Sequence, residues 1–148
     1  MMNNWIYNGN EITEQDFINF SEHGIIGFVY IITDLETNMK YIGKKIWITT
    51  KKLPPLKGQK RKRKKIVETD WKTYHGSSEE VKRLVEEYGP NRFKREILYL
   101  CKSKGELSYL EMKEQIECEV LLKPLEYHNS FIGGKIHRNH VKSLIKGD

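Results

Sequence analysis

The sequence of 148 residues has few cysteines, few prolines and no long hydrophobic run. Its two cysteines, Cys101 and Cys118, have no metal-type spacing, which predicts a reduced, intracellular protein with free thiols. No apolar run approaches the ~20 residues that a membrane-spanning helix needs, and the N-terminal residues lack the basic start of a signal peptide. These absences argue against a membrane protein, a secreted protein and a disulfide scaffold.

Acidic residues are absent from one long stretch, residues 44–65, which we call the basic arm. The arm holds 11 of the 26 Lys and Arg residues, so the remaining 15 are outnumbered by 20 Asp and Glu. The net charge of +6 therefore comes from one basic arm on an acidic body. Because cations that neutralise phosphates release condensed counterions, the arm predicts a nucleic-acid partner. A solvated charged loop and a localisation-type basic cluster are the alternatives.

The rest of the chain shows alternating strand and helix signals. Residues 25–34 and 39–46 are rich in β-branched and aromatic residues around a turn-prone segment, which predicts a hairpin. Capping-box spacings, Ser77 with Glu80 and Ser103 with Glu106, predict helices that begin at these serines, the second running to about Leu122. Residues 93–100 alternate as a third strand would.

The resulting order, β-β-α-β-α, predicts an α+β fold. We expect a single small domain with a three-stranded antiparallel sheet flanked by helices, plus the basic insertion. The expected divisions are an N-terminal extension over 1–24, a domain over 25–131 that contains the arm, and a C-terminal tail over 132–148.

A carboxylate lies within the apolar face of the last predicted helix. At about 100° per residue from Leu107, one apolar stripe holds Leu110, Cys118, Leu121 and Leu122. Glu114 falls inside this stripe at about 340°, and Glu111 falls at about 40° on the same face. A buried carboxylate is costly unless it is paired or binds a metal ion. A glutamate at the rim of the face or a salt bridge to a basic neighbour is the simpler structural interpretation of Glu114, and a metal site is the alternative.

Two tyrosines precede the arm, Tyr30 in "FVY" and Tyr41 in "YIG", eleven residues apart on the two predicted strands. With Glu114 and Asn129 after them in order, this segment resembles the GIY-YIG nucleases over about residues 25–131. The lysine-rich insertion makes it most similar to the small free-standing members that phages encode. The first motif departs from the family pattern, since it is FVY rather than GIY.

The resemblance implies a divalent-metal-dependent DNA endonuclease. It implies one Mg²⁺ or Mn²⁺ ion on Glu114, which is preferred to its rival Glu111 for its place in the apolar stripe and its spacing of 15 residues to Asn129. It also implies Tyr30 or Tyr41 as the base that handles the attacking water, and an ordering role for Asn129. Cations would hold the scissile phosphate: Lys44, together with Lys51, Arg61 or Arg63 in place of the family's arginine. His75 corresponds to a position at which some members have a functional histidine, although a partly buried loop histidine is an equal alternative.

The resemblance also implies double-stranded DNA as the partner and, for a phage-encoded member, the cytoplasm of a bacterial host cell as the location. The remaining lysines of the arm are expected to bind DNA: Lys45, Lys52, Lys57, Lys60, Lys62, Lys64 and Lys65. Target preference must then come from the arm, the tail or a homodimer. Two rival functions are a non-catalytic DNA-binding module with a degenerate site and a metal site at His137 and His140.

Overall fold

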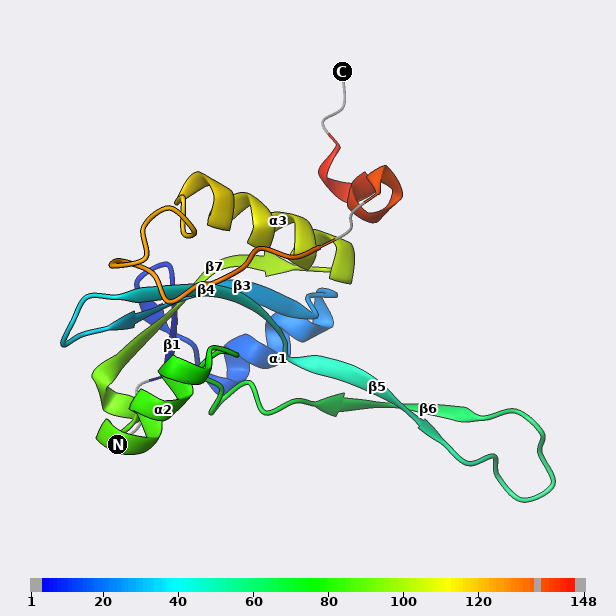
Figure 1. The fold of residues 1–148 in the computed structure, drawn as a ribbon. Coiled ribbons are helices and arrows are strands. Elements are labelled where there is room, and N and C mark those ends of the chain that lie inside the picture. The colour runs from blue at the N-terminus through cyan, green and yellow to red at the C-terminus, as the bar shows by residue number, and fades with distance from the viewer. Residues whose placement is uncertain (1–3, 135–136, 146–148) are drawn as a thin grey trace.

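The computed structural model describes residues 4–134 and 137–145, and within this part of the chain no helix is long and apolar enough to cross a membrane. It is a small α+β domain, as the sequence predicts, with a five-stranded sheet in the order β2-β1-β7-β3-β4 (Figure 1). The strands of this sheet are β1 (Trp5–Tyr7), β2 (Asn10–Glu11), β3 (Gly27–Asp34), β4 (Lys40–Ile46) and β7 (Phe93–Cys101).

The sheet has five strands rather than the three predicted, and one of its pairings is parallel. β3 pairs antiparallel with both β4 and β7, but β1 adds a strand parallel to β7 and β2 then pairs with β1. The N-terminal extension is therefore packed on the domain from Trp5 onward, since Trp5 is 2% exposed and its ring lies 4.8 Å from that of Phe28. Parts of the predicted extension and tail, residues 1–3, 135–136 and 146–148, lie outside the described residues.

Helices lie on both sides of the sheet. In Figure 1, α3 covers one face and α1 and α2 lie on the other side. An aromatic cluster fills the α1 side, with Trp47 and Trp71 buried in it, and an aliphatic cluster that includes Leu107 of α3 fills the other. The helices are α1 (Glu14–Glu22), α2 (Glu79–Tyr88) and α3 (Lys104–Glu117), with short 3₁₀ helices η1 (Pro90–Arg92) and η2 (Arg138–Leu144).

The ends of two helices differ from the predictions. α2 is capped by Ser78, whose side chain accepts a hydrogen bond from the Val81 amide, so Ser77 lies one residue before the cap. α3 begins after Ser103 as predicted but ends at Glu117 rather than near Leu122, because the chain turns at Cys118 and Glu119 has a positive φ of 54°. The apolar residues after Cys118 therefore do not continue the helical stripe.

The basic arm is a two-stranded hairpin that projects from the body, made of β5 (Ile48–Leu53) and β6 (Arg63–Glu68) (Figure 1). Trp47 anchors its base: this side chain is fully buried, and its indole Nε1 donates to the Ile25 carbonyl at 2.9 Å. The two strands rejoin the body together, because the Thr69 amide donates to the Trp47 carbonyl at 2.9 Å. The arm is thus a defined protrusion with a fixed root.

Candidate active site

The edge strand β4 carries the centre of the site. In its register with β3, Gly43 lies opposite Tyr30 and Tyr41 lies opposite Ile32. Residues that oppose each other in an antiparallel pair share a face, so Tyr30 and Tyr41 project from the same side of the sheet. Their ring centroids lie 6.4 Å apart. The hairpin therefore brings the two motif tyrosines together.

Tyr30 is the inner tyrosine of the pair. Only 1% of it is exposed, and its ring lies edge-on to that of Tyr74 with 6.0 Å between centroids. Burial raises the pKa of its phenol well above the ordinary value, and Tyr74, Tyr41 and Glu111 raise this pKa further. A phenol in this environment stays protonated at neutral pH and is shielded from bulk water.

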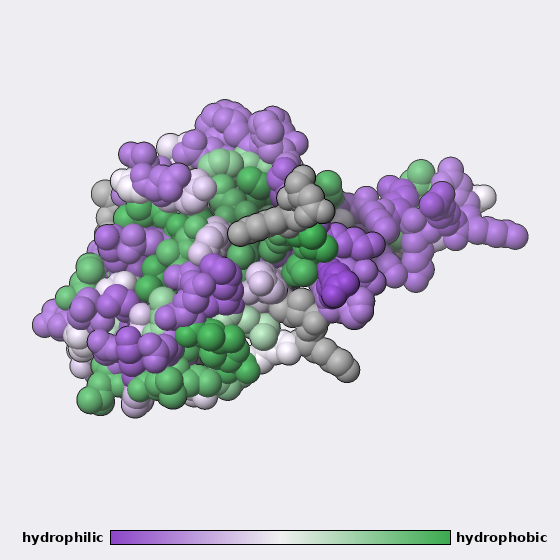
Figure 2. All heavy atoms as spheres, turned by 90° about the horizontal axis from the view of Figure 1, so that it is seen from above, coloured by the Kyte–Doolittle hydropathy of each residue, from purple (hydrophilic) through white to green (hydrophobic). Residues whose placement is uncertain are grey.

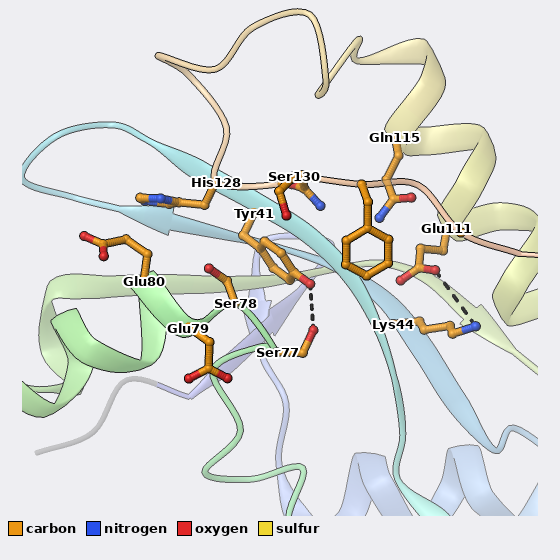
Figure 3. A pocket seen from close by; sticks show the side chains of 13 residues that line it. Tyr41, Lys44, Ser77, Ser78, Glu79, Glu80, Glu111, Gln115, His128 and Ser130 are labelled. Atoms are coloured by element: carbon orange, nitrogen blue, oxygen red, sulfur yellow. Dashed lines mark hydrogen bonds and ion pairs between the residues drawn. The ribbon is translucent and has the colours of Figure 1, made fainter.

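Tyr41 is the outer tyrosine and lines a cleft of about 560 Å³ (Figure 3). Its hydroxyl lies 2.7 Å from the Ser77 hydroxyl, just before α2. Burial raises the pKa of Tyr41, the Ser77 hydrogen bond lowers it, and the charges of Tyr74 and Glu111 raise it. Ser77 can make this contact because Ser78, not Ser77, caps the helix.

Two glycines make room for the paired rings. A Cβ on Gly43 would overlap the Tyr30 hydroxyl and lie 3.1 Å from the Tyr41 ring. A Cβ on Gly76 would lie 3.2 Å from the Tyr41 ring, and Gly76 also has a φ of 90°, which an L side chain rarely adopts. The glycine of "YIG" is therefore needed because the tyrosine hydroxyl occupies the space beside it.

We expect Gly43→Ala to displace the Tyr30 ring, reduce stability by about 1–3 kcal/mol and sharply reduce any DNA cleavage, because overpacking forces neighbouring groups apart. Thermal melting and plasmid cleavage measure the two effects. Gly133→Ala is the matched control: it lines the same cleft, but its Cβ would meet only Phe131, at an ordinary 3.5 Å. Equal behaviour of the two variants would contradict this packing argument.

Lys44 and Glu111 reach the same cleft from the opposite face of the sheet. The Lys44 Nζ donates to the Ser108 hydroxyl at 2.8 Å and lies 3.9 Å from a Glu111 carboxylate oxygen, as the dashed line in Figure 3 marks. The Glu111 side chain is 14% exposed. Burial raises the pKa of Glu111, and the Lys44 charge only partly opposes this shift. β4 is an edge strand, so side chains from both of its faces can meet in one cleft.

Glu114 points elsewhere. It accepts a hydrogen bond from the Tyr99 hydroxyl at 3.0 Å, on β7, and a weak one from the Cys118 thiol at 3.6 Å. Its charge contributes to the raised pKa of Tyr99, whereas that of Glu111 contributes to the raised pKa values of Tyr30 and Tyr41. The two carboxylates thus lie on opposite flanks of the sheet-facing side of α3, Glu114 toward β7 and Glu111 toward β4, so that Glu111 and not Glu114 lines the cleft with Tyr41.

Asn129 and Gln115 fasten the exposed edge of β4. The Asn129 side chain accepts from the Ile42 amide at 3.0 Å and donates to the Ile42 carbonyl at 2.8 Å, and Gln115 donates to the same carbonyl at 3.0 Å. Residues next to Asn129 also bond to Lys40 through the backbone. Asn129 is buried and borders the cleft, so its position fits an ordering role.

The two histidines near the site have different places. His75 is 8% exposed, its Nδ1 lies 2.8 Å from the Thr73 carbonyl, and its ring lies against Phe93. Burial lowers its pKa. It is not among the residues that line the cleft, whereas His128 is. His128 belongs to the same segment as Asn129, and burial lowers its pKa as well.

The cations of the arm beyond Lys44 lie outside the cleft. Lys51, Arg61 and Arg63 belong to the projecting hairpin and its tip, and Lys44 is the one Lys or Arg among the described residues that line the cleft. The basic side chains of the arm are exposed on the protrusion, which Figure 2 shows as mainly hydrophilic: Lys51, Lys52, Lys57, Lys60, Arg61, Lys62, Arg63, Lys64 and Lys65. Lys45 instead stays on β4 and pairs with Asp70 at 2.6 Å.

Sequence reasoning missed Ser77, Gln115 and His128 as residues of the cleft. The spacing of Ser77 to Glu80 predicted a helix cap, so its contact with Tyr41 was not expected. No sequence pattern distinguishes Gln115 from its neighbours. His128 lies next to Asn129, which offered the only hint. His137 and His140 lie apart from the cleft, where their Nδ1 atoms accept hydrogen bonds from backbone amides around η2.

A comparison with models of known protein families shows to which family the chain belongs. The family model described as "Putative endonuclease segE, GIY-YIG domain" matches residues 5–132. This chain belongs to that GIY-YIG family. Searches of the curated proteins and of the solved structures found no match. The family match includes β1 and α1, in agreement with their packing on the sheet.

Proposed function

We propose that this GIY-YIG domain is a divalent-metal-dependent endonuclease that hydrolyses phosphodiester bonds of double-stranded DNA. The observation that supports it is the convergence of Tyr41, Lys44 and Glu111 on one cleft, from both faces of an edge strand. A phenol, a cation and a carboxylate are the groups needed to handle an attacking water, hold a phosphate and bind a metal ion.

Glu111 replaces Glu114 in this proposal as the metal ligand. Its carboxylate is largely buried in the cleft with Tyr41, and burial raises its pKa although Lys44 opposes this shift. Among the described residues no group of three His, Cys, Asp or Glu side chains could hold a metal ion. One carboxylate completed by water and substrate phosphate suits Mg²⁺ or Mn²⁺, which keep several such ligands. A bound divalent ion would supply charge neutralisation at the phosphoryl group.

The side chains of the cleft then have distinct roles. Tyr41 is the working phenol, because its hydroxyl lines the cleft. Burial raises the pKa of Tyr41 and the 2.7 Å hydrogen bond with Ser77 lowers it, so this bond favours the phenolate, formed by loss of the phenol proton to solvent, that would accept a proton from the attacking water. Tyr30 positions the Tyr41 ring by packing against it from the buried side. Lys44 holds the scissile phosphate. Lys51, Arg61 and Arg63 lie on the arm and are not assigned a role in the cleft. His75 is proposed to support the loop that carries Ser77.

The deciding experiment incubates the purified protein with supercoiled plasmid in Mg²⁺, in Mn²⁺ and in EDTA, and then sequences the DNA ends. Metal-dependent nicks or breaks are expected. Binding without cleavage in either metal would favour the non-catalytic DNA-binding module instead.

The basic arm is proposed to supply most of the DNA affinity. Neutralising the six residues 60–65 should weaken binding to all sequences and reduce the salt dependence by about 0.9 log unit for each phosphate that is no longer neutralised, since each neutralised phosphate releases counterions. Binding to a short duplex across a salt series measures the slope. An unchanged slope would mean that the arm is a solvated loop and that DNA lies elsewhere.

A further inference from the structure

The charge of the basic arm is distributed over both faces of its hairpin. Lys51 lies opposite Lys65 in the β5–β6 register, and the next pair is Lys52 opposite Lys64. Opposed residues share a face and successive pairs alternate, so one lysine pair projects from each face of the ribbon. Arg63 adds a cation to the Lys51 face. Both faces of the ribbon are therefore positively charged along this part of its length.

Within the described residues, the cations of the ribbon have no carboxylate partner. None of the ion pairs in this part of the chain involves a residue of 48–65, and both strands are largely exposed. Like charges directly opposite each other destabilise a strand pair, and an isolated two-stranded hairpin is at best marginally stable in water. The free arm is therefore held in a conformation that negative charge on both of its faces would stabilise.

The root of the arm fixes its direction relative to the cleft. β5 follows β4 after one buried residue, Trp47, and the Thr69 hydroxyl donates to the Ile46 carbonyl at 2.7 Å. Between the cleft and the arm lies a second cavity, lined in part by Lys44, Lys45 and Lys104. Basic side chains thus continue from the scissile-phosphate position to the base of the ribbon.

We propose that the β5–β6 ribbon enters the major groove of duplex DNA next to the cleavage position and contacts the phosphates of both groove walls. This inference rests on the proposed DNA substrate. A ribbon lying flat on one backbone would use one face, whereas a groove presents phosphates to both. The major groove of B-DNA, about 12 Å wide, admits a two-stranded ribbon, and the minor groove, about 6 Å wide, is too narrow.

The length of the ribbon sets its reach. Strands of six residues extend about 20 Å at roughly 3.3 Å per residue. That length corresponds to about six base-pair steps of roughly 3.4 Å. The ribbon therefore contacts about half a helical turn on one side of the cleavage position, and the protected region of the DNA is asymmetric about the cut.

Two face-matched variants test the proposal, Lys51→Gln with Lys65→Gln and Lys52→Gln with Lys64→Gln. Binding to a short duplex is measured in EDTA across a salt series, with Lys82→Gln plus Lys94→Gln, on exposed positions of the body, as the control. Each arm pair should make the slope of log affinity against log salt concentration less steep, by up to about 1.8 for two phosphates. The control should not. Because each arm variant removes a repulsive pair, the fold should be retained, and circular dichroism checks this.

Groove choice is tested with modified DNA. Methylation of guanine N7, in the major groove, should interfere with binding, and distamycin, a minor-groove ligand, should not compete. An effect of only one face pair, no effect of either, or competition by distamycin without N7 interference would overturn the inference. These readouts need no cleavage. A protein that binds in this way but cuts nothing would overturn the proposed nuclease function alone, and one that cuts with a dispensable arm would overturn only the groove proposal.

Discussion

Glu111→Gln should abolish DNA cleavage, by at least about 1,000-fold, while DNA binding in EDTA stays close to that of the parent. The change removes the proposed metal ligand and the charge stabilisation that depends on it, which is worth several kcal/mol in the transition state. It leaves the basic arm untouched. Plasmid cleavage in Mg²⁺ and duplex binding in EDTA measure the two properties separately.

This variant should not lose stability. The pKa of Glu111 is raised in the folded protein, so folding favours the protonated carboxyl, and above that pKa the ionised group opposes folding. A neutral Gln removes that cost at neutral pH, and it loses the 3.9 Å contact with the Lys44 ammonium and weakens the hydrogen bond from the Lys44 backbone. The Glu111 charge also raises the pKa of Tyr41, so the variant should lower that pKa in metal-free protein. A tyrosine titration tests this independently of activity.

Glu114→Gln is the control, because Glu114 lies on the same helix but bonds to Tyr99 on the other side. It should cut DNA at near-parental rates, with a modest stability loss from the altered hydrogen bond. The opposite pattern, loss of cleavage in Glu114→Gln alone, would restore the metal ligand that the sequence favours. If both variants cut normally, the proposed metal site is wrong.

Tyr41→Phe should reduce cleavage by about 100-fold or more, the scale of a positioned proton-transfer group. The ring and its packing remain, and the removed hydroxyl is hydrogen-bonded to the exposed Ser77 side chain, so melting should change by no more than a few degrees. The measurement is the single-turnover cleavage rate in saturating Mg²⁺ beside a thermal melt.

Tyr30→Phe is the comparison that separates the two phenols. Its hydroxyl is buried against Tyr74 and Gly43, so its removal should cost stability as well as activity, because Tyr74 loses a partner in the core. Ser77→Ala should also reduce cleavage, because burial raises the pKa of Tyr41 and the Ser77 hydrogen bond lowers it. Full activity of Tyr41→Phe would show that the matched tyrosines are scaffolding and that the water is activated elsewhere.

The sequence predicted those helices and strands whose ends are marked by nearby turns, caps or a clear hydrophobic period. The β3–β4 hairpin, α2, β7 and the start of α3 lie within a few residues of the predicted ranges, since each has a turn, a cap or a clear period of its own. β1 has three residues and pairs with β7, about 90 positions later, so no local period could reveal it. Trp5 was its one hint, as a large aromatic in a polar segment.

The choice between the two glutamates depended on a helix end that the sequence did not reveal. The apolar stripe that favoured Glu114 was drawn through Leu121 and Leu122, which lie beyond the end of α3 and do not follow its rotation. Gln115, buried at 5% exposure, marks the true inward side toward β4, and Glu111 lies one turn before it. Sequence periodicity cannot distinguish carboxylates on the two flanks of the buried face. Their roles depend on which strand each one faces in the folded protein.

The bonds from Asn129 to Ile42 join positions 87 residues apart, and they close the border of the cleft. During synthesis from the N-terminus, the tyrosine hairpin emerges long before the segment that fastens its outer strand. Contacts so distant in sequence are formed late and slowly. A nascent chain that has not yet reached Asn129 therefore carries the phenols and the basic ribbon without an assembled cleft. The order of synthesis thus delays assembly of the cleft until Asn129 has been made.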